Sequence, residues 1–293
     1  MSLAETRGVI VVTGVSTGIG LAITKRFLAS GYEVFGSTRK PADADRLYYE
    51  LGDHFHRLVF DVRDEAAIRQ AAREVRNRLG GRRLMALINN AGIGSNAPLM
   101  FQPMDDIATV VDVNLLGPLR VMQAFMPLLG VDPALVGTPG RIVNISSVGA
   151  LMGAPFMGAY GAAKRGLEAA SDSARAELLP YGVDVIVIAP GFFQSAIRDS
   201  DPSDFARYDN TAFGPAYRRF AQIFDAGVAQ AWPAETLAEL VEEVVTARKP
   251  KAHYYVGPPG KFMVWMMSKM SRRMRARATA KQFGMFESAK AAK

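Results

Sequence analysis

The chain has 293 residues and is 49% hydrophobic, so it is long enough to bury a large core in one or two domains. It has no cysteine, which excludes disulfides, thiolate catalysis and zinc–thiolate sites. The net charge is +7, but eleven Lys and Arg against one Glu lie after residue 248, which leaves −3 for the residues before it. The main body therefore lacks the charge of a nucleic-acid-binding protein, and we expect no such partner.

Targeting and metal-binding signals are missing from the sequence. No apolar stretch reaches the ~18 residues of a spanning helix, and residues 8–13 are too short and lack the basic flank of a signal peptide. We therefore expect a cytoplasmic protein. His54, His56 and His253 are scattered rather than clustered as metal ligands, and we expect His54 and His56 in a solvated turn before a strand.

A strand, a glycine turn and a helix open the chain. Residues 8–13 form a β-branched run, and apolar residues then recur at helical spacing until Gly31. Glycines let the backbone approach a diphosphate, and the helix N-terminus offers free N–H groups to it. The spacing is G-x-x-x-G-x-G rather than G-x-G-x-x-G, and a tight turn without ligand is the alternative. The residues that we expect to bind a dinucleotide here are Gly14, Ser16, Thr17, Gly18, Ile19 and Gly20.

The second strand, residues 33–37, ends at Thr38 and Arg39. In dinucleotide-binding folds an acidic residue at this point binds the ribose 2′-hydroxyl, whereas an arginine accommodates a 2′-phosphate. No Asp or Glu stands at this strand end, and Arg39 and Lys40 supply two positive charges. This pattern favours NADP(H), although Arg39 as a merely solvated residue is the alternative.

Two further strand ends carry candidate cofactor residues. Residues 58–62 predict the third strand, where Asp61, beside Val62, can accept a hydrogen bond from an adenine amino group. Asp61 could instead cap the helix predicted over residues 64–79, but Asp64 suits that role better. Residues 84–89 predict the fourth strand, followed by Asn90, Ala91 and Gly92, which permit close backbone approach to a ligand.

The middle of the chain continues the alternation of strands and helices. Residues 105–129 predict one long helix with Asn114 inside it, where a structural bridge to a neighbouring backbone and a catalytic use are both open. Residues 142–145 and 183–189 predict the fifth and sixth strands, the latter ended by Pro190 and Gly191. Six strands alternating with helices predict an α/β fold with a doubly wound parallel sheet, and without a linker or repeat we expect a single domain over residues 1–293.

The helix after the fifth strand holds Tyr160 and Lys164, four residues apart. This spacing places both side chains on one face, with Cβ atoms about 5–6 Å apart. A phenol of pKa about 10 needs a nearby cation to act as a base at neutral pH, and Lys164 is placed to be that cation. Ser147, at the end of the fifth strand, stands where open parallel sheets bind ligands.

Together these motifs resemble the short-chain dehydrogenase/reductase family. The residues that carry the resemblance are Thr13-Gly-x-x-x-Gly-Ile-Gly20, Asp61-Val62, Asn89-Asn-Ala-Gly92, Asn114, Ser147, Tyr160-x-x-x-Lys164 and Pro190-Gly191. The resemblance implies a Rossmann-type sheet of seven strands in the order 3-2-1-4-5-6-7, with residues 253–256 as the seventh strand. It also places Thr38 and Arg39 in the NADP-preferring group and implies a homo-oligomer.

The resemblance also assigns catalytic roles. Tyr160 would be the general acid or base at the substrate oxygen, and Lys164 would lower its pKa and hold the nicotinamide ribose. Ser147 would hydrogen-bond the substrate oxygen, since Ser146 is one residue off the expected register, and Asn114 would hold a water. Further cofactor contacts are carried over to Tyr160, Lys164, Pro190, Gly191, Phe193 and Ser195, where Ser195 replaces the usual threonine.

The substrate class is inferred from apolar residues near these positions. Residues 251–262 look like the branch of 17β-hydroxysteroid and retinol dehydrogenases, which implies a lipophilic alcohol, ketone or aldehyde. About 40 residues after Gly191 show little regular pattern, which predicts a substrate lid over residues 192–230. The candidate substrate contacts are Met152, Phe156, Met157 and Phe192. Two alternatives remain: a reductase of small polar or acyl-carrier carbonyls, and a non-catalytic NADP-sensing protein.

The basic residues after residue 258 accompany a row of methionines at helical spacing, which predicts a basic amphipathic helix over residues 258–293. Such a helix can lie on an anionic membrane surface as a peripheral contact. It can equally fold over the body as a lid or form an interface, and we favour the lid or interface.

Overall fold

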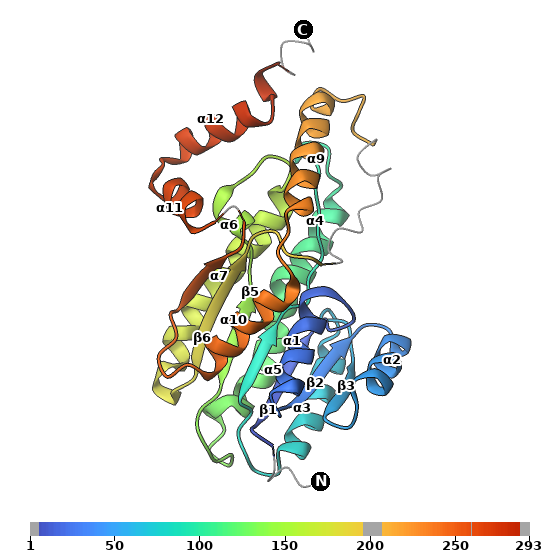
Figure 1. Ribbon diagram of the computed structural model, residues 1–293, viewed down its shortest axis with the longest axis vertical. Helices are drawn as coiled ribbons and strands as arrows, with labels where there is room; N and C mark the ends of the chain where they lie inside the picture. Colours follow the sequence, from blue (N-terminus) through green and yellow to red (C-terminus); the bar gives the residue numbers. More distant parts are fainter. Residues whose placement is uncertain (1–5, 196–206, 259, 288–293) are drawn as a thin grey trace.

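The computed structural model describes residues 6–195, 207–258 and 260–287 (Figure 1). Its strands all pair in parallel within one sheet of order β3-β2-β1-β4-β5-β6-β7, as predicted. The strands are β1 (Val9–Thr13), β2 (Glu33–Thr38), β3 (Phe55–Val59), β4 (Ala86–Asn89), β5 (Arg141–Ile145), β6 (Asp184–Pro190) and β7 (His253–Val256).

Helices cover both faces of the sheet. The α-helices are α1 (Gly18–Ala29), α2 (Pro41–Leu51), α3 (Glu65–Leu79), α4 (Met104–Val111), α5 (Gly117–Met126), α6 (Val148–Met152), α7 (Gly158–Leu178), α9 (Gly214–Ala229), α10 (Ala234–Thr246), α11 (Lys261–Lys269) and α12 (Arg272–Gln282). Helical turns of other types are η2 (Asp112–Leu116), η3 (Pro127–Val131) and η4 (Leu179–Tyr181). In Figure 1, α1 and α10 lie together on one side of the sheet.

Two hydrophobic cores follow from this layering. In β1, Val9 and Val11 point into the core that α3 and α5 cover, whereas Ile10 and Val12 point into the core beneath α1 and α10. Side chains alternate between the faces of a strand, so a strand covered on both faces must be apolar throughout. This is why the continuous apolar runs identified the central strands correctly.

The third strand was misplaced at the edge of the sheet. It spans Phe55–Val59 rather than residues 58–62, so Asp61 lies in the loop beyond it. Only Phe55 and Leu58 of this edge strand are buried, and a search for continuous apolar runs misses such a half-exposed strand. The solvated turn expected for His56 is also wrong, because this residue lies in β3 and its ring nitrogen is 3.0 Å from the Glu33 carboxylate.

The helix predicted over residues 105–129 is interrupted twice. The chain forms α4, then the π-helical turn η2 around Asn114, then α5, and a second π-helical turn begins at Pro127. Proline lacks the backbone N–H that continues a helix, which accounts for the end of α5. The helix of residues 64–79 is confirmed, with the Asp64 side chain accepting the predicted capping bond from the Ala67 N–H at 3.0 Å.

Two predictions about the last hundred residues are wrong. The stretch expected to have little regular pattern contains α9, a helix of 16 residues, and residues 196–206 lie outside the described residues. The single basic helix is instead two helices, α11 and α12, separated at Met270 and Ser271. The Ser271 hydroxyl accepts from the Met274 N–H at 3.3 Å, so a new helix starts there.

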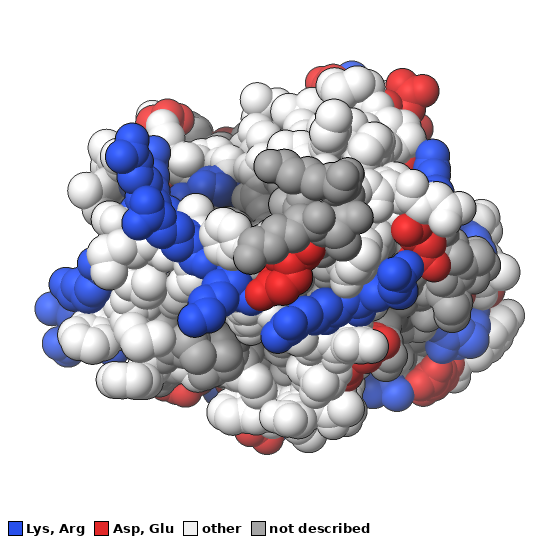
Figure 2. All heavy atoms as spheres, turned by 90° about the horizontal axis from the view of Figure 1, so that it is seen from above, with Lys and Arg blue, Asp and Glu red and all other residues white. Residues whose placement is uncertain are grey.

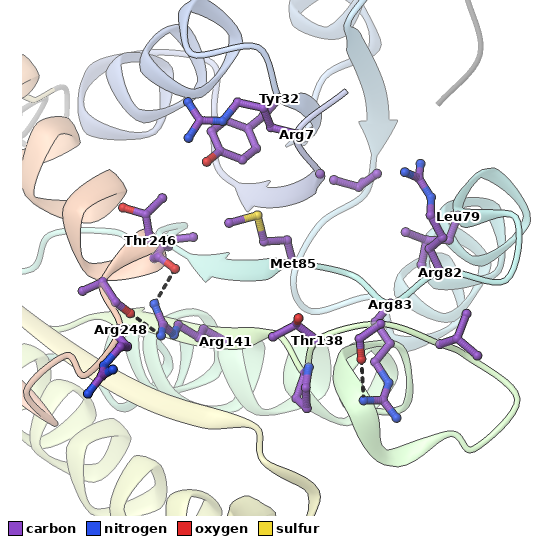
Figure 3. A pocket seen from close by; sticks show the side chains of 17 residues that line it. Arg7, Tyr32, Leu79, Arg82, Arg83, Met85, Thr138, Arg141, Thr246 and Arg248 are labelled. Carbon is purple, nitrogen blue, oxygen red and sulfur yellow. Dashed lines mark hydrogen bonds between the residues drawn. The ribbon is translucent and has the colours of Figure 1, made fainter. Parts of the chain in front are cut away.

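A cavity of about 970 Å³ opens at the amino ends of the strands (Figure 3). Three of its arginines, Arg7, Arg83 and Arg141, donate to backbone carbonyls. Arg141 donates to the carbonyls of Val244 at 2.9 Å, of Ala247 at 2.5 Å and of Val245, and so ties β5 to the C-terminus of α10. A cation at this end also opposes the negative end of the helix dipole. We therefore assign Arg141 a structural role.

We expect Arg141→Leu to lower the free energy of unfolding by about 1.5–3 kcal/mol, because charge-assisted hydrogen bonds to these carbonyls are lost. Urea denaturation measures the change. Arg248→Gln is the matched control, because Arg248 lines the same cavity but is exposed. Equal stability of the Leu variant and the wild type would show that these bonds contribute nothing.

Candidate active site

A second cavity, of about 610 Å³, lies at the carboxyl ends of the central strands. It brings together fourteen of the nineteen residues predicted to bind a dinucleotide, and Tyr160 and Lys164 are not among them. Those that line it are Gly14, Ser16, Thr17, Gly18, Ile19, Gly20, Thr38, Arg39, Asp61, Val62, Asn90, Ala91, Gly92 and Ser195. Lys40, predicted beside Arg39 as a positive charge, lines it too, and so do Ser37 and Ile93, which were not predicted.

The glycine turn between β1 and α1 is held close to the loop after β4. A Cβ at Gly14, whose φ is +70°, would lie 2.8 Å from the Ala91 Cα, and a Cβ at Gly20 would lie 2.2 Å from the Gly14 carbonyl oxygen. The Asn90 side-chain amide donates to the Thr13 and Gly14 carbonyls, both at 3.0 Å. Only glycine fits at these positions, and Asn90 fixes the shape of the turn.

The start of α1 is suited to an anion. Its N-cap residue, Thr17, makes no side-chain capping bond, and no acidic residue stands in the first turn. The backbone N–H groups of this turn therefore stay available at the positive end of the helix dipole. Together with the crowded glycines, this arrangement fits the diphosphate of a dinucleotide.

The cavity wall beside β2 and β3 is positively charged on one side. Arg39 and Lys40 are exposed there, and the Thr38 hydroxyl donates to the Lys40 carbonyl at 3.0 Å. Asp61 is engaged by Arg63, whose guanidinium donates to it at 2.8 and 3.1 Å and, through these hydrogen bonds, lowers the pKa of the carboxyl. No sequence pattern predicts this ion pair. Arg63 binds both oxygens of the Asp61 carboxylate, which was expected to accept a hydrogen bond from adenine.

Tyr160 and Lys164 lie on α7 as predicted, and both are almost completely buried, with 8% and 3% of their surface exposed. Tyr160 shares a hydrogen bond with the Ser147 hydroxyl, which also accepts from the Gly149 N–H at 3.1 Å. The Lys164 ammonium donates to the Ile145 carbonyl at 2.9 Å. Helix α7 and the end of β5 thus place a phenol, a hydroxyl and a cation in one buried site.

Burial determines the protonation of this site. It raises the pKa of Tyr160, and the hydrogen bond with Ser147 opposes that rise only in part. Burial also lowers the pKa of Lys164, to about 8. The predicted lowering of the Tyr160 pKa is therefore wrong for this arrangement, because desolvation of the phenolate outweighs the stabilisation it receives. A protonated phenol at neutral pH is suited to donate a proton.

Asn114 is fully buried in the π-helical turn and bridges to the loop after β4. Its side-chain oxygen accepts from the Ile93 N–H at 2.9 Å, and its amide donates to the Ile93 carbonyl at 2.8 Å. The structural alternative for Asn114 is thus confirmed, while its water-holding role stays a prediction. π-Helical turns are frequent at functional sites, and this one lies beside Gly92, where a Cβ would be 2.8 Å from the Asn114 side-chain oxygen.

Ser146 and Ser147 point to different partners. The Ser146 hydroxyl donates to Glu168 at 2.8 Å, and both residues are buried. Glu168 lies on α7, one turn beyond Lys164 on the same face, and the sequence reading missed it although the spacing of four was visible. Ser146 is committed to this carboxylate, which supports the choice of Ser147 for the site.

The remaining predicted contacts lie outside the described lining of the cavity. Phe193 is buried in the core and its ring packs against Trp232 at 6.1 Å, and its contact with a cofactor stays a prediction. Gly191 binds β7 through its N–H, at 2.8 Å from the Val256 carbonyl, directly after Pro190. These residues instead close the end of the sheet.

The predicted substrate residues divide in a similar way. Phe156 is buried with its ring 5.0 Å from Tyr217 and 5.5 Å from Phe220 of α9, and Phe192 packs on Phe224 of α9 at 5.4 Å. Both rings pack against α9, and their role as substrate contacts stays a prediction. Met152 and Met157 are half-buried on either side of this packing and stay predictions.

Within the described ranges, no group of three His, Asp or Glu side chains could hold a metal ion. No described helix combines the length and the apolar character needed to cross a bilayer.

Comparison with known proteins gives consistent matches. The model of the short chain dehydrogenase family matches residues 8–205. An NADPH-dependent 3-dehydrocapnine reductase of Ornithobacterium rhinotracheale is 36% identical over 248 residues, which cover 85% of this chain and 87% of that protein. Retinol dehydrogenase 5 of Mus musculus is 30% identical over 284 residues, which cover 90% of this chain and 85% of that protein.

A solved structure of a short-chain dehydrogenase from Streptomyces avermitilis has a TM-score of 0.74 to this structure at 23% identity, covering 97% of this chain and 98% of that chain. It shares the fold. The family match covers more than half of the chain, and it includes the glycine turn, Ser147, Tyr160 and Lys164. The chain therefore belongs to the short chain dehydrogenase family.

Proposed function

We propose that the protein is an NADP(H)-dependent oxidoreductase that transfers a hydride between the nicotinamide and a lipophilic alcohol, ketone or aldehyde. The observation that carries this proposal is the assembly of half-buried Ser147 with buried Tyr160 and Lys164. It lies beside the cavity shaped for a dinucleotide, since a Cβ at Gly92 of the cavity wall would be 3.5 Å from the Lys164 ammonium. Such an assembly supplies a proton donor, a hydrogen-bond donor and a cation at one place, as reduction of a carbonyl requires.

In the reducing direction, a bound nicotinamide would supply the hydride to the carbonyl carbon. Tyr160 gives its phenolic proton to the carbonyl oxygen, which becomes the hydroxyl of the product. Ser147 orients that oxygen through its hydroxyl, and the buried Lys164 cation stabilises the phenolate left behind. In the oxidising direction the same proton returns to Tyr160. A non-catalytic, cofactor-sensing protein would not need these three groups together.

The choice of NADP(H) is supported by Arg39 and Lys40 at the rim of the cavity, and by the name of the 3-dehydrocapnine reductase, which states dependence on NADPH. A guanidinium at this position can form charge-assisted bonds with a 2′-phosphate.

We expect Arg39→Asp to shift the ratio of kcat/KM for NADPH over NADH by about 10–100-fold towards NADH, because a charged hydrogen bond of about 1.5–3 kcal/mol is replaced by repulsion. Steady-state kinetics with both cofactors measure the ratio. The control is Arg69→Asp, which makes the same change on exposed α3 away from the cavity. A wild type that uses NADH as well as NADPH would contradict the assignment.

The lipophilic class of substrate is proposed from the surroundings of the site. Helix α9 presents aromatic rings to the residues between Ser147 and Tyr160, and the loop after β4 carries exposed Leu99, Met100 and Phe101. Binding pockets are mainly apolar, with few polar groups to fix orientation. The name of retinol dehydrogenase 5 is consistent with this class. A reductase of small polar or acyl-carrier carbonyls is the alternative.

A series of straight-chain ketones of rising length tests the substrate class. We expect each added CH₂ to improve kcat/KM by up to about 0.8 kcal/mol, or roughly fourfold, until the pocket is full. Polyhydroxylated ketones of equal length serve as the control series. A flat response, or a preference for the polyhydroxylated compounds, would contradict a lipophilic pocket while leaving hydride transfer in place.

Three broader features of the molecule also stay proposals. We propose that residues 192–230 act as a substrate lid, that the protein forms a homo-oligomer, and that it works in the cytoplasm. Sedimentation velocity of the full chain measures the oligomeric state, and a purely monomeric protein would contradict that part.

A further inference from the structure

We propose that α11, α12 and the loop before α4 form a docking surface for an anionic lipid membrane. All of them lie at the end of the molecule where the strands have their carboxyl ends (Figure 1). The proposal about docking is independent of the enzymatic function. Its consequence, that a lipophilic substrate enters from the membrane side, rests on the proposed function.

Helix α11 has one face against the body and one free face. Val264 and Met267 are buried, whereas Phe262, Trp265 and Met266 are 73%, 57% and 39% exposed. The exposed three are spaced i, i+3 and i+4, so they lie on the face opposite the buried pair. Exposed aromatic rings of this size are unusual on a surface that meets only water, and Trp is enriched at membrane interfaces.

A second exposed apolar group lies at the same end. Leu99, Met100, Phe101 and Met104 are exposed in the loop before α4 and at its start. The Phe101 ring packs at 6.0 Å from Phe213, which precedes α9, so this loop is fixed against the body. Both apolar groups are therefore exposed at the same end of the molecule.

Basic side chains accompany the apolar face. Lys269, Arg272, Arg273, Arg277 and Lys281 are exposed, and none of them forms an ion pair with a described residue. Figure 2 shows Lys and Arg side chains across this end, set among mostly uncharged surface. Basic residues beside exposed apolar ones are the combination by which peripheral helices bind anionic lipids.

Charge decides against a second copy of this chain as the occupant. Helices α11 and α12 together contain seven Lys and Arg and no Asp or Glu, so the same face on a second copy would bring two strongly positive segments together. Like charges repel at such an interface, whereas an anionic bilayer complements them. The membrane is therefore the occupant that the charges favour.

The docking surface is tied directly to the catalytic region. Arg275 of α12 donates to the Leu151 carbonyl at 2.9 Å, and Leu151 belongs to α6, the helix that Ser147 caps. Beyond α12, Phe283 packs on Phe220 of α9 at 5.6 Å. The last residues thus cover the body as a lid would, while their outer side faces away from it. A docked protein would hold this lid at the lipid surface.

The test is co-sedimentation of the full chain with vesicles of phosphatidylcholine, alone or with about 30% phosphatidylserine. We expect binding to the anionic vesicles at low salt and its loss at about 0.5 M salt, where charges are screened. Arg272→Gln/Arg273→Gln/Arg277→Gln should weaken binding by about 100-fold. Phe262→Ser/Trp265→Ser should also weaken binding to the same vesicles at low salt, because the exposed aromatic rings can no longer enter the lipid.

Matched controls alter similar side chains elsewhere. Arg57→Gln/Arg69→Gln/Arg73→Gln removes three exposed arginines, and Tyr48→Ser/Tyr49→Ser removes two exposed aromatic rings of α2. Both should bind vesicles like the wild type. Absence of binding at low salt, or equal binding by all variants, would overturn the proposal. The proposal would also be overturned if the α11 and α12 variants bound vesicles like the wild type but were shown by sedimentation velocity to have lost an oligomeric state. That result would make this surface an interface between subunits.

Turnover of a short, water-soluble ketone separates this proposal from the proposed function. Docking variants should keep that turnover and lose only activity on a long-chain ketone held in anionic vesicles. Vesicle binding without turnover of either ketone would refute the enzyme and leave docking intact. Turnover of both ketones without vesicle binding would refute docking and leave the enzyme intact.

Discussion

Replacing Tyr160 by Phe is expected to lower kcat for carbonyl reduction by about 10²–10⁴-fold, the usual contribution of general acid–base catalysis. The phenol is buried, shares a hydrogen bond with Ser147 and has a pKa raised by burial, so it is the proton donor available to a carbonyl at neutral pH. The Phe ring retains the apolar contacts of the Tyr ring, so NADPH should bind with unchanged affinity. Stopped-flow turnover and fluorescence titration of NADPH measure the two quantities separately.

The matched control is Tyr32→Phe. Tyr32 is buried to a similar degree but lines the cavity at the opposite end of the sheet, so this variant removes a buried hydroxyl without touching the site. It should keep full activity. If Tyr160→Phe retained most of its turnover, another group would be the acid, and the mechanism proposed for Ser147, Tyr160 and Lys164 would be wrong.

The features that the sequence predicted correctly are those encoded over a few neighbouring residues. The glycine turn needs Gly14, Gly18 and Gly20 at fixed positions because the backbone folds back on itself there. Tyr160 and Lys164 share a face of α7 because their spacing equals about one helical turn. The strands β1 and β5 are covered on both faces, so their apolar runs were unambiguous.

The features that the sequence did not predict depend mainly on contacts between residues that are distant in sequence. Asn114 lies where its predicted helix is interrupted, and its side chain binds the backbone N–H and carbonyl of Ile93, 21 residues away. Phe156 packs against α9 with a φ of +69°, which no sequence pattern for Phe would predict. The exposed edge strand β3 lacks the continuous apolar run of its buried neighbours.

The conflict at Lys164 shows how a site residue can oppose stability. Lys164 is 3% exposed, donates to the Ile145 carbonyl, and has a pKa lowered by burial to about 8 from 10.5. Below pH 8 the folded protein therefore holds a buried charge that the unfolded chain would keep in water. Between pH 8 and 10.5 the unfolded chain binds more protons at Lys164 than the folded protein does. The free energy of unfolding therefore rises with pH through that window.

Lys164→Met is accordingly expected to lower kcat/KM by about 10²–10³-fold, because a cation that stabilises developing charge is removed. The same variant should be more stable than the wild type at pH 7, by up to about 3 kcal/mol before the loss of the Ile145 hydrogen bond is subtracted. That excess stability should fade as the pH rises from 8 to 10.5.

Urea denaturation at several pH values measures the difference in stability, with exposed Lys281→Met as the control. If the Met variant were less stable than the wild type at pH 7, or if the difference in stability did not change with pH, burial of the Lys164 charge would carry no desolvation cost. If the variant kept full activity, Lys164 would not be a catalytic residue.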